Sequence, residues 1–137
     1  MTPNVIIEEL LDPDGKKMVE YGLQRGELSG TQVQEVASLR AKHRRVSASD
    51  LFALVLARAL KATVLTGDRH LTQVAAQEGV PVHGTLWVLD ELVRLAVVAP
   101  SQAAQALKQM LANRRRLPQA KCKKRLSLNN SQKKQFP

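Results

Sequence analysis

Two aspartates stand where the sequence predicts that helices begin, and they are the residues best placed to do chemistry. Asp50 lies in the first turn of a helix predicted over 48–60, and Asp68 follows a buried strand predicted over 63–66. Ligand sites in open α/β sheets lie beyond the carboxyl ends of the strands. Carboxylates gathered there are ligands for a hard cation such as Mg²⁺ or Mn²⁺. Aspartate also caps helices, and spacing alone favours that structural role.

Other kinds of chemical site find little support in the sequence. The three histidines (His43, His70 and His83) show no metal-ligand spacing, and there is no glycine-rich phosphate loop. The single cysteine, Cys122, excludes an intramolecular disulfide and a cysteine-based zinc site. Four aromatic residues are too few for a platform that stacks the bases of single strands.

Basic residues gather in two segments of the chain. The net charge is +9, and residues 1–112 are neutral overall, so the whole excess lies in residues 113–137. A second basic cluster occupies 40–45, at the end of a helix predicted over 31–43. Cations at a helix C-terminus complement its dipole, and a basic tail can be merely solvated. Both segments could also contact the phosphates of RNA.

The predicted elements alternate between helix and strand with short links, which indicates an α/β fold with a parallel sheet. The 137 residues fit one domain. Only two strands are well defined, at 63–66 and 80–83, and a doubtful third lies near 22–28, which is few for a sheet covered on both faces. No signal peptide or membrane-spanning run is visible, so we expect a cytoplasmic protein.

Three blocks of sequence, taken in order, carry a resemblance to a known family. Residues 2–10 read as a helix start with Glu9 before a leucine, and residues 46–51 place Asp50 ahead of an alanine- and leucine-rich helix. In the third block, 65–71, Thr66 and Asp68 stand at a strand end. Their order and spacing resemble the PIN-domain ribonucleases, including the VapC-like toxins of bacterial toxin–antitoxin pairs, over about residues 2–118.

The resemblance implies a PIN-like three-layer α/β/α sandwich and a metal-dependent endoribonuclease that acts as a toxin. It implies that Glu9 (with Glu8 as the fallback), Asp50 and Asp68 hold Mg²⁺ or Mn²⁺, and that Thr66 orients a carboxylate or a water. It also implies RNA as substrate, an antitoxin protein as partner and a homodimer. The residues expected to contact RNA are Arg40, Lys42, Arg44, Arg45, Arg114, Arg115 and Arg116.

The start of the chain departs from the family pattern. The family begins with a central strand that ends in an aspartate, and no aspartate precedes Glu8 here. We therefore expect a PIN-like domain over 1–113 that lacks its first central strand, and a basic, flexible tail over 114–137. Three explanations fit: an internal Met1, a decayed member without activity, or a second subunit that fills the gap. The alternative function is a non-catalytic PIN-like remnant that binds nucleic acid or a partner.

Overall fold

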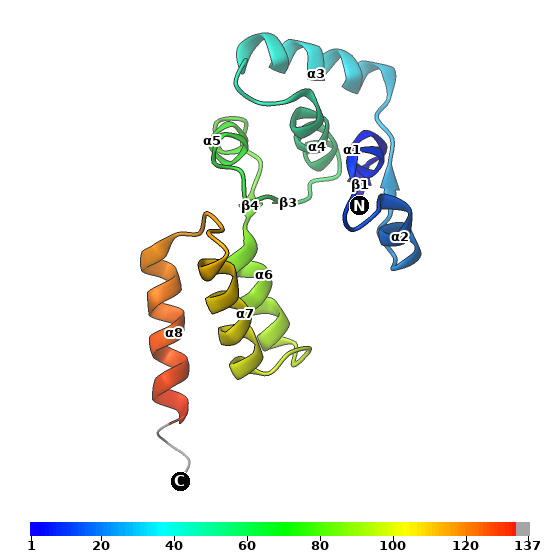
Figure 1. The fold of residues 1–137 in the computed structure, drawn as a ribbon. Helices are drawn as coiled ribbons and strands as arrows, with labels where there is room; N and C mark the ends of the chain where they lie inside the picture. Colours follow the sequence, from blue (N-terminus) through cyan, green and yellow to red (C-terminus); the bar gives the residue numbers. More distant parts are fainter. Residues whose placement is uncertain (134–137) are drawn as a thin grey trace. The chain divides into compact units, whose positions relative to one another are not determined.

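The computed structural model describes the backbone of residues 1–133 and the side chains of residues 1–128 (Figure 1). The chain divides into two compact units, the first over Met1–Val82 and the second from His83 onwards. Every residue predicted to hold metal lies in unit 1. In the described part of the chain, no helix is both long and apolar enough to cross a bilayer.

Unit 1 alternates short strands with helices. Its elements are β1 (Thr2–Pro3), α1 (Asn4–Glu9), α2 (Gly15–Glu20), β2 (Arg25–Gly26), α3 (Gly30–Lys42), α4 (Ala48–Ala59), β3 (Val64–Leu65), α5 (Arg69–Gln77) and the first residue of β4 (Val82–His83). The helices predicted over 31–43 and 48–60 correspond to α3 and α4 within one residue at each end.

Two short pairs of strands form the sheets of the described chain. β1 runs parallel to β2, with Thr2 opposite Arg25 and Pro3 opposite Gly26. The connection between them contains α1 and α2, as parallel pairing requires a crossover. β3 lies beside β4, and the Val64 amide donates to the Pro81 carbonyl at 2.9 Å. The α/β class predicted from the sequence is confirmed.

The first residues differ from the sequence prediction. Thr2 and Pro3 were expected to open a helix, but they pair as β1, and α1 begins at Asn4 with Pro3 as its N-cap. The Thr2 amide donates to the Gln24 carbonyl at 2.9 Å, which holds this segment extended. A partner so far along the chain leaves no local signal in the sequence.

Helix α4 forms the centre of unit 1. Its sequence is apolar on nearly every side, and Leu51, Leu54 and Val55 are almost completely buried. It packs against α3, α5, β1 and β3, so apolar residues are needed on most of its faces. Because α4 is fixed on several sides, its amino end is a rigid position for polar side chains.

Unit 2 consists of three helices: α6 (Thr85–Arg94), α7 (Pro100–Ala112) and α8 (Gln119–Lys133). α7 packs against both α6 and α8. Their core contains Leu86, Leu107 and Cys122, and the thiol-bearing Cys122 is completely buried.

Part of the segment predicted as a basic, flexible tail, 114–137, is helical. Residues 119–133 form α8, and Leu126 packs beside Cys122 against α6 and α7. The buried face of α8 is marked in the sequence only by Cys122 and Leu126, which lie one turn apart. This pattern is too short to predict a helix. Residues 134–137 of the expected tail lie outside the described residues.

Candidate functional site

Two of the predicted metal ligands stand near the amino end of α4, each held by a different serine. Ser47 caps this helix, because its hydroxyl accepts from the Asp50 amide at 3.1 Å and donates to the Asp50 carboxylate at 2.8 Å. The next serine, Ser49, donates its hydroxyl to the Glu9 carboxylate at the end of α1. Glu9 and Ser49 are 40 residues apart in the chain. Folding therefore places Glu9 beside the turn that carries Asp50.

The third predicted ligand, Asp68, is the N-cap of α5. Its carboxylate accepts from the Leu71 amide at 2.7 Å, and its own amide donates to the Thr66 hydroxyl at 3.1 Å. Thr66 thus contacts the backbone of Asp68, and its predicted role of orienting a carboxylate or a water stays a prediction. The contact fixes the backbone at the start of α5, and the carboxylate has a capping role of its own.

The donor set fits a divalent cation in part. In residues 1–128, no three side chains of the metal-binding types come together into one group. Glu9 and Asp50 nevertheless place carboxylate oxygens at one helix end, and Mg²⁺ is commonly held by one or two carboxylates together with water and substrate phosphates. Glu9 and Asp50 stand near the same helix end and Asp68 caps α5, and a metal site formed by these acids stays a prediction.

The predicted RNA-binding residues have different surroundings. Arg40 donates to the carbonyls of Arg44, at 3.0 Å, and Val46, so it holds the loop between α3 and α4. The side chains of Arg44 and Arg45 are exposed on that loop. The residues Arg114–Arg116 are exposed too, but they belong to unit 2.

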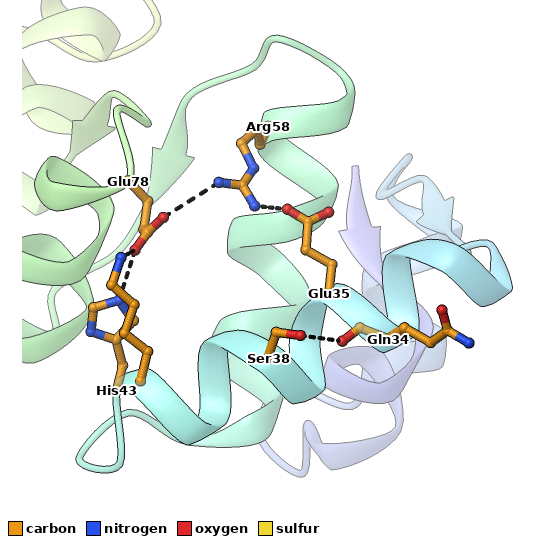
Figure 2. A network of polar contacts seen from close by, with 7 residues as sticks. Gln34, Glu35, Ser38, His43, Arg58 and Glu78 are labelled. Carbon is orange, nitrogen blue, oxygen red and sulfur yellow. Dashed lines mark hydrogen bonds and ion pairs between the residues drawn. The ribbon is translucent and has the colours of Figure 1, made fainter.

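A charged network in unit 1 was missed by the sequence analysis (Figure 2). The Glu78 carboxylate contacts the Lys42 ammonium at 2.7 Å, the His43 ring at 2.8 Å and the Arg58 guanidinium at 3.5 Å. Arg58 also pairs with Glu35. Hydrogen bonds from Lys42 and then His43 lower the pKa of Glu78 to about 2. The partners lie 20 to 36 residues from Glu78 in the chain, so no short sequence motif predicts the network.

A comparison of the sequence with known protein families identifies the family of this chain. A family model described as PIN domain matches residues 1–131. The chain therefore belongs to the PIN-domain family, which confirms the family suggested by the three sequence blocks. No curated protein and no solved structure gives a significant match. The expected loss of a first central strand stays a prediction.

Proposed function

We propose that this chain is a metal-dependent ribonuclease of the PIN type. Its Mg²⁺ or Mn²⁺ would be held at the amino end of α4 by Glu9 and Asp50, with Asp68 contributing from the start of α5. The observation that carries this proposal is the meeting of Glu9 with the first turn of α4 through Ser49. It occurs in a member of the PIN-domain family, at the predicted acids.

The chain's own residues would prepare this site for catalysis. The hydroxyls of Ser47 and Ser49 hold the carboxylates of Asp50 and Glu9 in place. Thr66 fixes the backbone of Asp68. A bound divalent cation supplies a coordinated water of lowered pKa and stabilises negative charge on a phosphate. Exposed cations in the loop between α3 and α4 add attraction for the RNA backbone.

A second function is favoured by one observation. The Asp68 carboxylate already accepts a hydrogen bond from the Leu71 amide, so it serves α5 without any metal. This arrangement suits a non-catalytic PIN-domain protein that binds nucleic acid or a partner. The narrower role of a toxin, with an antitoxin protein and a homodimer, is supported by the sequence resemblance alone.

The deciding experiment measures RNA cleavage and Mn²⁺ binding by the purified chain and its variants. Asp50→Asn is expected to abolish both, because it removes a carboxylate from the amino end of α4, and Asp68→Asn is expected to weaken both. Asp14→Asn is the control and is matched to Asp68→Asn. Like Asp68, Asp14 caps a helix: in α2 it accepts from the Lys16 amide at 2.9 Å.

The two proposed functions predict different results. Cleavage by the original chain and the Asp14→Asn variant, but not by Asp50→Asn, supports the ribonuclease. Unchanged Mn²⁺ affinity in both Asp50→Asn and Asp68→Asn would show that the metal site is wrongly assigned. RNA binding without Mn²⁺ binding or cleavage supports the non-catalytic protein.

A further inference from the structure

A polar hollow of about 450 Å³ lies in unit 1, away from the contacts of Glu9. One wall is the segment 41–46, which ends α3 and leads towards α4. The opposite wall is α5, which contributes His70, Gln73, Val74 and Gln77. The hollow is therefore formed by two elements that are brought together only by folding.

The lining of this hollow is strongly biased towards positive charge. Lys42, Arg44 and Arg45 line it, and its lining includes no acidic residue. The Lys42 ammonium is paired with Glu78. The side chains of Arg44 and Arg45 are exposed and have no hydrogen bond or ion pair within the described part of the chain. Two guanidinium groups are thus available to an anion.

The basic wall is held in shape by other residues. Arg40 donates to the carbonyls of Arg44 and Val46 and so fixes the backbone of the segment 41–46. Glu78 holds Lys42 and His43 from the side of α5 (Figure 2). Because these contacts do not involve the side chains of Arg44 and Arg45, the loop is ordered before a ligand arrives. Less conformational entropy is therefore lost when a ligand binds at such a site.

The wall on α5 supplies neutral hydrogen-bonding groups. His70, Gln73 and Gln77 are spaced by three and four residues, so they share one face of the helix. The neighbouring face, with Leu71 and Ala75, is buried in the core. Arginine and glutamine side chains are common donors to the phosphates and sugars of nucleic acids.

Both walls continue into the elements that carry predicted acids. The segment 41–46 is followed at once by Ser47, the cap of the helix that holds Asp50. His70 stands in the first turn of α5, two residues after its cap Asp68. A nucleic-acid strand bound in the hollow would therefore contact α5 and the segment that leads directly into α4, the two helices on which the proposed hydrolysis depends.

We propose that this hollow binds the backbone of a single RNA strand. Arg44 and Arg45 contact phosphate oxygens, and Gln73 and Gln77 contact a neighbouring phosphate or ribose. The choice of RNA rests on the proposed function, whereas the preference for an anion follows from the charge of the lining.

The test measures the affinity of the full chain for a labelled, short single-stranded oligoribonucleotide by fluorescence anisotropy. EDTA is present, and the titration is repeated at several salt concentrations. The variant Arg44→Ala/Arg45→Ala is compared with Lys16→Ala/Lys17→Ala, which removes two exposed cations from α2 of the same unit. We expect about tenfold weaker binding for the arginine variant and a salt slope shallower by about 1.4, since each lost phosphate contact on a single strand is worth about 0.7.

A second variant reports on the α5 wall. Gln73→Glu places an acid in the hollow without changing either arginine, and its side chain is exposed, so the fold is expected to tolerate it. Binding should weaken several-fold by repulsion of the phosphates. Circular dichroism verifies that each variant keeps its helices.

Several results would overturn the proposal. Unchanged affinity in the arginine variant, or equal losses in the arginine and lysine variants, would show that this hollow has no special role. Displacement of the RNA by inorganic phosphate at equal concentration would assign the hollow to a free anion instead. Because EDTA removes the metal, this measurement does not depend on the proposed metal site, and a failed cleavage assay leaves it unaffected.

Discussion

At the scale of single residues, Glu78 has an electrostatic setting that makes the stability of unit 1 depend on pH. Lys42 and His43 donate to its carboxylate and lower its pKa from 4.5 to about 2. A lowered pKa in the folded state means that the unfolded chain takes up the proton more readily. The stabilisation is therefore complete above about pH 4.5 and is lost as the pH falls through about 2.

Glu78→Gln should reveal this stabilisation directly. We expect a loss of about 2 kcal/mol in the free energy of unfolding at neutral pH, because the amide cannot replace the charge-assisted hydrogen bonds. Urea denaturation at several pH values should show the difference from the original chain shrinking below about pH 4.5.

Glu20→Gln is the control for this measurement, since Glu20 is an exposed carboxylate at the end of α2. It should change stability by only a few tenths of a kcal/mol. If the two variants were equally stable at every pH, the network would contribute nothing to folding.

Some residues of the candidate site are predictable from local sequence signals, and others are not. Asp50 and Asp68 are predictable because each stands next to a local signal, the start of a predicted helix or the end of a predicted strand. The contact between Ser49 and Glu9 joins segments 40 residues apart, and it forms only on folding, when β1, which leads directly into α1, packs against α4. Glu78 was missed for the same reason, since its partners come from α3 and α4.

At the scale of elements, Asp68 has two roles that substitution can separate. Its carboxylate caps α5 by accepting from the Leu71 amide. Asp68→Ala should cost about 1 kcal/mol of stability, whereas Asp68→Asn should stay within a few tenths because asparagine caps equally well. Chemical denaturation of the two variants measures the cap, and Mn²⁺ titration of Asp68→Asn measures the proposed ligand. If Asp68→Ala left the free energy of unfolding unchanged, the capping role would be contradicted.

The junction of α1 and α2 depends on a glycine. Gly15 is buried at the start of α2, and a Cβ atom there would lie 2.0 Å from the carbonyl oxygen of Ile7. Because backbone has to move, Gly15→Ala should destabilise the chain by about 1–3 kcal/mol. The measurement is the midpoint of thermal unfolding.

Gly30→Ala is the matched control, because Gly30 also begins a helix, α3, and nothing lies within 4 Å of its added Cβ. We expect this variant to be neutral or slightly more stable, since alanine favours the helix and restricts the unfolded chain. Equal destabilisation of the two variants would contradict the steric argument.

Elements with strong local signals were predictable, and those that depend on distant partners were less so. The helix predicted over 31–43 is α3, and a local signal marks its start: Ser29 caps it, with a reciprocal bond from the Ser29 amide to the Gln32 side chain at 2.8 Å. The strand predicted over 63–66 is shorter, Val64–Leu65, and it pairs with β4, which is equally short. β1 and α8 were missed because tertiary contacts hold them in place.

At the scale of the whole molecule, positive charge is concentrated after residue 112. Part of that charge is now placed on α8, where Lys121, Lys123 and Lys124 are exposed while Cys122 is buried between them. Removing residues 114–137 would therefore also remove core contacts of Leu107 with α8. Substitution is the cleaner test of the charge.

Replacing Lys121, Lys123 and Lys124 by glutamine should reduce the salt dependence of RNA binding while α8 stays folded. We expect the slope of log affinity against log salt to become shallower by up to about 2, at about 0.7 for each lost phosphate contact. The change should add to that of Arg44→Ala/Arg45→Ala, because the two sets of cations belong to different units and share no contact within the described residues. Anisotropy titrations of the lysine variant, the arginine variant and their combination measure this. An unchanged slope in the lysine variant would mean that the charge of α8 is simply solvated, and a less than additive combination would mean that both segments compete for the same phosphates.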